Sequence, residues 1–241
     1  MPLRLPKPYN VLPGHSWPRL FLLLMLAGCA AALPPRPLAP PETIRASILR
    51  LAEQEWGAFN GQTIRFNAMG REIIDPVGAW EDEKRAAPLV EKYWRAVGTD
   101  WTGYDVDKPW SAAFISWVMA EAGVSSDEMP PSATHAGYLR AAIAADGGNW
   151  RPHPPDAYAP RAGDLVCATR AGQKIERFDE IPAGATLHCD IVVLTGVGRL
   201  WSIGGNVRNS VTRTERPIDG NGYLTAESGR RWFLVLENLY P

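Results

Sequence analysis

Pro109-Trp110-Ser111-Ala112-Ala113-Phe114-Ile115-Ser116-Trp117 is the stretch on which the fold prediction for this 241-residue chain depends. It opens a predicted helix that runs to Ala122 and ends at Gly123, because glycine readily takes the left-handed conformation found just past a helix end. Apolar residues at helical spacing and good capping residues predict three further helices. These lie over residues 43–57, 80–97 and 132–145.

The second half of the chain has a different character. Short runs of β-branched and aromatic residues, separated by glycine, asparagine and proline, are typical of strands. They are predicted over residues 164–168, 189–194, 200–203, 207–212 and 232–237. Because the helices come first and the strands afterwards, the sequence predicts an α+β domain over residues 42–241, with N-terminal helices packed on a C-terminal antiparallel sheet.

The first 41 residues predict export and lipid anchoring. Basic residues precede an apolar run from Leu20 to Ala27, which is the layout of a signal peptide over residues 1–28. This run is shorter than the roughly 20 apolar residues that span a bilayer. Leu26-Ala27-Gly28-Cys29 resembles a lipobox, which implies cleavage before Cys29 and lipidation of that residue. Residues 29–41 contain five prolines and predict a semi-rigid linker.

These features predict a lipid-anchored protein of the bacterial cell envelope. Ala30 follows Cys29 where an Asp would favour retention in the inner membrane, so we expect the periplasmic face of the outer membrane. The inner membrane is the alternative.

Composition narrows the partners and the chemistry. The formal net charge is −1, which gives no electrostatic footprint for nucleic acid, so no nucleic-acid partner is expected. Beyond the signal region, His135, His153 and His188 are too dispersed to predict a metal site, and no cofactor is expected. Cys167 and Cys189 could form a disulfide in an oxidising envelope, and two buried free thiols are the competing interpretation.

Four segments resemble those of NlpC-like and CHAP-type cell-wall hydrolases, a papain-like superfamily. In that superfamily a Trp-Cys-Ala-Ala-Phe-Val pattern places a catalytic cysteine in the first turn of a helix, and Ser111 occupies the cysteine position here. Residues 160–166, 188–193 and 203–211 follow in the order of the superfamily's first strand, histidine strand and Gly-Gly-Asn segment. The chain is also similar, over residues 43–241, to domain-of-unknown-function family 2272. The resemblance implies a papain-like fold and an amide hydrolase.

The resemblance also implies roles for individual residues. A serine at a helix N-terminus stays protonated at neutral pH, so Ser111 needs a base, and His188 is the candidate. Asn206 is the candidate third group that orients the imidazole, while Asp190, on the same strand face as His188, is a rival orienter or a substrate contact. Three of these residues also have a structural interpretation: Ser111 as a helix cap, Asn206 as a turn residue and His188 as an ordinary half-exposed residue at a strand start.

Four other residues are candidate substrate contacts. Trp110 and Gly205 adjoin the candidate catalytic residues, and His135 and Tyr138 share one side of a predicted helix at i, i+3 spacing. A packed helix surface is the alternative for the last two.

Three hypotheses for function follow. The first is a peptidoglycan-directed amide hydrolase that acts on a stem peptide. The second is a catalytically inactive relative that binds wall peptides or an envelope protein, and the third is a structural lipoprotein that positions a partner.

Overall fold

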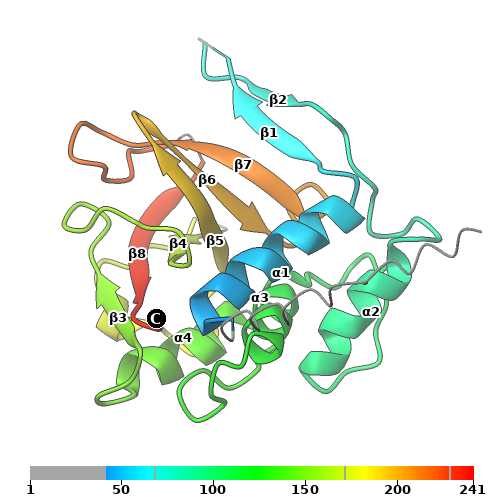
Figure 1. The fold of residues 1–241 in the computed structure, drawn as a ribbon, viewed down its shortest axis with the longest axis horizontal. Coiled ribbons are helices and arrows are strands. Elements are labelled where there is room, and N and C mark those ends of the chain that lie inside the picture. Colours follow the sequence, from blue (N-terminus) through cyan, green and yellow to red (C-terminus); the bar gives the residue numbers. More distant parts are fainter. Residues whose placement is uncertain (1–41, 68, 171, 228) are drawn as a thin grey trace, which may run out of the picture. The chain divides into compact units, whose positions relative to one another are not determined.

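The computed structural model describes residues 42–67, 69–170, 172–227 and 229–241 (Figure 1). The predicted signal peptide, Cys29 and the proline-rich linker lie outside the described residues. None of the helices described has the length and apolar character needed to cross a bilayer.

Four α-helices lie within the described part of the chain. They are α1 (Ile44–Ala58), α2 (Ala87–Ala96), α3 (Ser111–Glu121) and α4 (His135–Ala144), with a short 3₁₀ turn at Phe178–Glu180. Thr43 and Thr134 cap α1 and α4 by accepting backbone N–H groups with their hydroxyls. Gly123, after α3, has a φ of +89°, as its predicted place at the helix end requires.

The second helix begins later than the sequence predicted. Residues 80–86 form turns, and α2 starts at Ala87 with Pro88 in its first turn. Proline has no N–H to donate, so it is tolerated at the start of a helix but breaks its interior. The predicted helix over 80–97 is therefore wrong in its first two turns.

The strands form one eight-stranded sheet in the order β2-β1-β7-β6-β5-β4-β8-β3. Their bounds are β1 (Thr63–Phe66), β2 (Glu72–Ile74), β3 (Trp150–His153), β4 (Leu165–Thr169), β5 (Leu187–Gly196), β6 (Arg199–Gly204), β7 (Thr212–Pro217) and β8 (Arg231–Asn238). The mixed α+β class predicted from the sequence is confirmed.

Several details of the sheet differ from the prediction. β1, β2 and β3 are additional strands, and β1 pairs with β7 in parallel, so the sheet is not wholly antiparallel. The predicted strand over 207–212 is a loop, because Asn206, Arg208 and Asn209 have φ values of 54° to 58°. Left-handed residues cannot continue an extended strand, so β7 begins only at Thr212.

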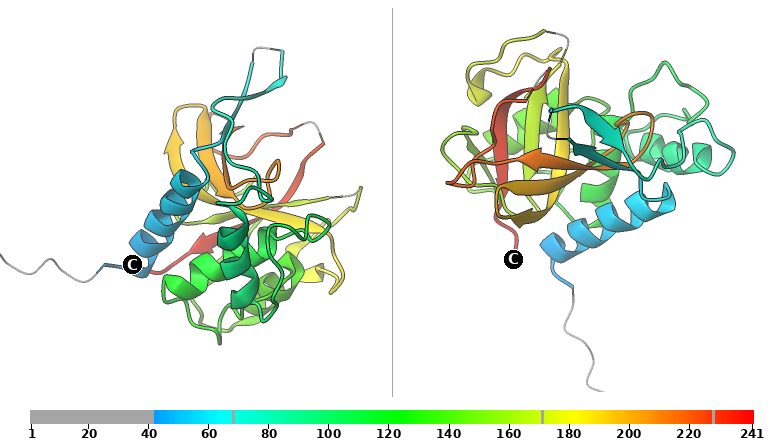
Figure 2. Two further views of the ribbon diagram at one scale, coloured as in Figure 1. Left: turned by 90° about the vertical axis from the view of Figure 1, so that its right-hand side faces the viewer. Right: turned by 90° about the horizontal axis from the view of Figure 1, so that it is seen from above.

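The helices cover one face of the sheet (Figures 1 and 2). α1, α3 and α4 pack against β5, and α2 packs on α3. Successive strand residues point to opposite faces, so Cys189 and Ile191 enter the main core with the helices. Val192 belongs to a second, smaller apolar cluster on the opposite face. His188 and Asp190 alternate with Cys189 and Ile191 along β5, so they point to the same face as Val192.

A disulfide links the two central strands β4 and β5. Cys167 and Cys189 are directly opposite each other in the strand register, and their Sγ atoms are 2.10 Å apart. Both side chains are fully buried. The two cysteines are 22 residues apart in the sequence, and Cys189 is the residue that follows His188 on β5.

We expect the double variant Cys167→Ala/Cys189→Ala to lose about 2–4 kcal/mol of unfolding free energy, because the open chain has more conformational entropy when unfolded. Chemical denaturation measures this loss. A reductant should lower the stability of the wild type in the same way and leave the double variant unchanged. A wild type that is insensitive to reductant would contradict the disulfide.

Candidate functional site

Ser111 is the first residue of α3, and its side chain is nearly inaccessible. Its hydroxyl does not cap the helix: the N-cap is Trp110, and Ser111 Oγ lies 2.7 Å from His135 Nε2. The first α-helical bond here runs from the Phe114 N–H to the Trp110 carbonyl, at 3.0 Å. The N–H groups of residues 111–113 therefore precede the helical ladder and are available to a negatively charged oxygen.

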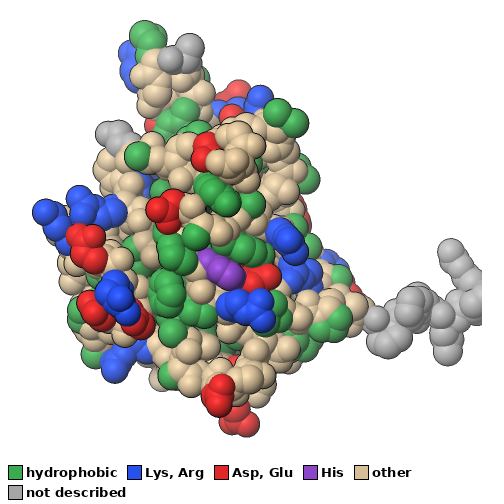
Figure 3. All heavy atoms as spheres, turned by 90° about the vertical axis from the view of Figure 1, so that its left-hand side faces the viewer, with side chains coloured by type: hydrophobic (Ala, Val, Ile, Leu, Met, Phe, Trp, Pro, Cys, Tyr) green, Lys and Arg blue, Asp and Glu red, His purple; other side chains and the backbone are tan. Residues whose placement is uncertain are grey.

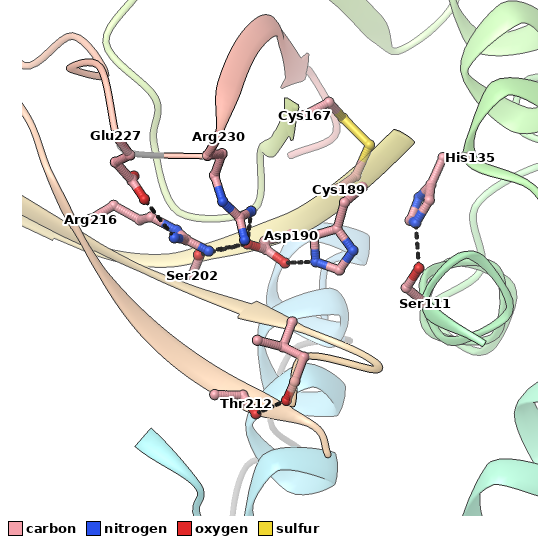
Figure 4. A network of polar contacts seen from close by, with 12 residues as sticks. Ser111, His135, Cys167, Cys189, Asp190, Ser202, Thr212, Arg216, Glu227 and Arg230 are labelled. Carbon is pink, nitrogen blue, oxygen red and sulfur yellow. Dashed lines mark hydrogen bonds and ion pairs between the residues drawn. A yellow bond between two sulfur atoms is a disulfide. The ribbon is translucent and has the colours of Figure 1, made fainter. Parts of the chain in front are cut away.

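His135 opens α4 and faces the N-terminus of α3 (Figure 4). Its second ring nitrogen, Nδ1, is hydrogen-bonded to the hydroxyl of Tyr138, one helical turn along. Both side chains are buried, His135 at 5% exposure and Tyr138 at 0%. The i, i+3 spacing in the sequence predicted that they share a side, whereas the contact with Ser111 joins two helices and had no sequence signal.

His188 and Asp190 form a buried pair on β5. His188 Nε2 lies 2.8 Å from Asp190 Oδ1, while within the described chain His188 Nδ1 has no hydrogen-bond partner. The His135 and His188 rings are 5.6 Å apart, so the pair lies beside the Ser111 contact. Of the two candidate orienting groups, Asp190 is the one that contacts His188.

Asp190 also contacts two arginine side chains that the sequence did not predict. Its Oδ2 accepts hydrogen bonds from Arg216 Nη2 at 2.9 Å and Ser202 Oγ at 3.3 Å, and Arg230 Nη1 lies 3.6 Å away (Figure 4). Arg216 Nη1 also donates a hydrogen bond to Glu227 Oε2 at 2.9 Å. Nothing in the sequence pointed to the Arg216 contact, because Arg216 lies beyond the strand predicted over residues 207–212 and its burial on β7 is known only from the structure.

Asn206 does not lie on a strand. It follows β6 in a turn, with a φ of 54°, and the described residues show no hydrogen bond between it and His188. Asparagine tolerates the left-handed region better than most residues, which explains its place in this turn. Asn206 nevertheless lines the same cavity as His188.

Gly205 and Trp110 hold the turn against α3. A Cβ atom on Gly205 would lie 2.5 Å from Phe114 Cβ and 2.8 Å from Trp110 Cζ3. Trp110 is 1% exposed, and its indole N–H donates to the carboxylate of Glu81. In this structure both predicted substrate contacts are buried packing residues.

The electrostatics keep both histidines neutral. Burial lowers the pKa of His135 well below its usual value, and the neighbouring His188 lowers it further. Burial also lowers the pKa of His188, although Asp190 opposes this effect. Burial alone would raise the pKa of Asp190, but His188 and Arg216 bring it well below the usual range. The site at neutral pH therefore holds an ionised Asp190 and two uncharged imidazoles.

Across residues 42–241, leaving aside the three undescribed positions, no three His, Cys, Asp or Glu side chains are grouped to hold an ion. The polar groups that the site presents are a hydroxyl, two imidazoles, a carboxylate and the guanidinium groups beside it.

We expect Gly205→Ala to lower the unfolding free energy by about 1–3 kcal/mol, because the added methyl group collides with α3. Gly220→Ala is the matched control: a Cβ at that position would meet no atom within 4 Å, so its effect should stay within about 0.5 kcal/mol. Urea denaturation measures both. Equal stability of the two variants would show that the turn does not pack tightly on α3.

We also expect the unfolding free energy to fall as the pH drops below about 6.5. The pKa values of His135 and His188 are depressed in the folded state, so the unfolded chain binds more protons in this range and acid favours it. Each histidine contributes up to about 1.4 kcal/mol per pH unit. Denaturation at pH 8, 7, 6 and 5 measures the slope, which should be shallower in His135→Gln and unchanged in Ser111→Ala. A flat profile for the wild type would refute neutral burial.

Comparison with known proteins identifies one family. Residues 75–237 match the model of the family described as "Uncharacterized protein conserved in bacteria (DUF2272)". No curated protein and no solved structure matches the chain. The matched range contains Ser111, His135, His188 and the arginine group around Asp190. The chain belongs to the DUF2272 family.

Proposed function

We propose that this protein is an envelope lipoprotein, anchored through Cys29, whose domain hydrolyses amide bonds in the stem peptides of peptidoglycan. The observation that carries the proposal is the contact of Ser111 Oγ with a buried imidazole, at 2.7 Å, at the N-terminus of α3. The contact holds the hydroxyl at the start of α3, and a second imidazole that can serve as its base lies beside it, since the His135 and His188 ring centroids are 5.6 Å apart. The His188–Asp190 pair beside it supplies an imidazole with a carboxylate to orient it.

His188 is the better base of the two histidines. Asp190 accepts a hydrogen bond from His188 Nε2, which leaves the lone pair on Nδ1 free to take a proton. Asp190 would also stabilise the imidazolium that forms, as the aspartate of a serine protease does. His135 has no carboxylate hydrogen-bonded to its ring, and its depressed pKa makes it a weak proton acceptor.

The donors and acceptors around His135 give it a different role. His135 Nδ1 is the hydrogen-bond partner of the buried Tyr138 hydroxyl. A buried hydroxyl that donates to nothing is costly, so Tyr138 donates to Nδ1, and the ring proton resides on Nε2. His135 Nε2 then donates to Ser111 Oγ, which leaves the Ser111 hydroxyl proton free for His188. His135 is thus assigned as a positioning residue that holds the nucleophile.

The reaction then follows the serine-hydrolase scheme. Ser111 Oγ attacks the amide carbon while its proton passes to His188 Nδ1, and the N–H groups at the start of α3 receive the developing oxyanion. The C–N bond breaks, and the proton on His188 moves to the leaving amine. Water then attacks the acyl-enzyme and gives a proton to His188. As the bond to Ser111 Oγ breaks, His188 returns this proton to Oγ, which releases the carboxylic acid and restores the Ser111 hydroxyl.

Peptidoglycan is proposed as the substrate for two reasons: the resemblance to cell-wall hydrolases and the predicted location of the protein. The order of the nucleophile helix, the histidine strand and the Gly-Gly-Asn segment resembles papain-like cell-wall hydrolases, and the signal peptide and lipobox would place the domain where peptidoglycan lies. α3 packs on β5, which carries His188, and this supports the papain-like assignment.

An inactive binding module is the second candidate. It is favoured by the 3% exposure of Ser111 and by the direction of its hydroxyl, which contacts His135 and makes no hydrogen bond to His188 within the described chain. Contacts of a catalytic base are often loose in the absence of substrate, so this geometry does not decide against the enzyme.

The test is the release of muropeptides from purified peptidoglycan by residues 42–241. We expect Ser111→Ala and His188→Ala each to lower the rate by at least about 100-fold. His135→Gln keeps a donor to Ser111, and we expect it to lose only about tenfold. The exposed Ser126→Ala is the matched control and should match the wild type.

Two outcomes would overturn this assignment. Equal product profiles for the wild type, Ser111→Ala and His188→Ala would refute the hydrolase. Binding of the wild type to sacculi without cleavage, with activity appearing only in Ser111→Cys, would favour the binding module.

A further inference from the structure

A cavity of about 410 Å³ opens beside the His188–Asp190 pair. It lies between the start of β5, the turn after β6 and the segment before β8, and both His188 and Asn206 line it. The charged side chains that line it are mainly basic: Arg170, Arg208, Arg216 and Arg230, with Glu72. The molecular face drawn in Figure 3 carries both basic and acidic side chains.

Two of these arginines are already neutralised by carboxylates. Arg208 donates to both oxygens of Glu72, at 2.8 and 3.1 Å. Arg216 donates one hydrogen bond to Asp190 and one to Glu227, each at 2.9 Å. These contacts use three carboxylates for two guanidinium groups.

The other two arginines lack a hydrogen-bonded carboxylate. Arg230 Nη1 is buried, lies 3.6 Å from Asp190 Oδ2 and has no hydrogen-bond partner in the described structure. Arg170 forms no ion pair with any described residue, and its side chain is exposed at the cavity. Four arginines against three carboxylates leave the cavity with one net positive charge.

The electrostatics of Arg230 point the same way. Burial and the nearby Arg216 lower its pKa to about 10, so Arg230 remains charged at neutral pH at an energetic cost. A buried cation with an unmet donor is stabilised by any anion that can accept from it. Figure 4 shows Arg230 directed toward the Asp190 side of the network.

We propose that this cavity binds a free carboxylate of the peptide substrate, held by Arg230 and Arg170, next to the bond that Ser111 cleaves. The inference rests on the proposed function and deepens it, because it selects peptides with a carboxylate close to the scissile amide. Guanidinium groups match the planar geometry of a carboxylate through paired N–H donors. One net positive charge matches a monoanion such as a carboxylate, whereas inorganic phosphate at neutral pH is a mixture of monoanion and dianion.

Binding is tested in the full chain carrying Ser111→Ala, so that the result does not depend on hydrolysis. The probes for calorimetry are a stem tetrapeptide with free carboxylates, the same peptide with every carboxylate amidated, and inorganic phosphate. We expect the free peptide to bind at least about tenfold more tightly than the amidated one, the usual scale for a hydrogen bond to a charged group.

Variants of the two arginines test whether these residues bind the carboxylate of the peptide. We expect Arg230→Gln and Arg170→Gln each to weaken binding of the free peptide about tenfold and to leave the amidated peptide unaffected. Arg140→Gln, on the exposed side of α4 and outside the cavity lining, is the matched control and should change neither affinity. Arg230→Lys keeps the charge and should retain the preference for the free peptide, which separates loss of charge from misfolding.

Several results would overturn the inference: equal affinity for the two peptides, unchanged binding in both glutamine variants, or tighter binding of phosphate than of the free peptide. These failures differ from failure of the proposed function. A wild type that cleaves free and amidated peptides at the same rate would be a hydrolase without the carboxylate site. A chain that prefers the free peptide and cleaves nothing would keep the site and lose the hydrolase.

Discussion

The buried carboxylate of Asp190 is the interaction on which the rest of the site depends. It accepts from His188 on one oxygen and from Arg216 and Ser202 on the other. An uncompensated charge at 1% exposure would be strongly unfavourable, and breaking such a buried pair typically costs about 3–5 kcal/mol. Asp190 therefore fixes the tautomer of His188 and, through Arg216, connects β5 with β7 and Glu227. The orientation of the imidazole and the charge of the neighbouring cavity have one common origin.

A second constraint brings the serine to this pair. Gly204 is the last residue of β6 and Gly205 follows it in the turn, and neither position has room for a side chain: a Cβ on Gly204 would lie 1.9 Å from Asp190 Oδ1, and one on Gly205 would collide with Phe114. The missing side chains let the turn approach both the carboxylate and α3 closely. Because α3 begins at Ser111, this packing sets where the hydroxyl stands relative to β5. The glycines thus contribute by allowing this close approach.

Sequence periodicity predicted those parts of the molecule that local chemistry controls. The helix that opens near Ser111, the strand with His188 and Asp190 on one face, and the α+β order all follow from residue patterns read over fewer than about 20 positions. Predictions failed where a single residue overrides the pattern. Pro88 delays the start of α2, and the left-handed turn around Asn206 replaces a predicted strand with a loop.

The sequence by itself determined the fold class and the shared face of His188 and Asp190, because helix and strand periods are local properties of the backbone. Ser111 became the nucleophile candidate through the resemblance of its segment to papain-like hydrolases. Only the tertiary structure decided that Ser111 contacts His135, that Asp190 rather than Asn206 pairs with His188, and that four arginines gather at one cavity. The serine contact and the arginine cavity join residues from different helices and strands. Their geometry is set by how α3, α4 and the sheet pack together, and no pattern along the chain encodes that packing.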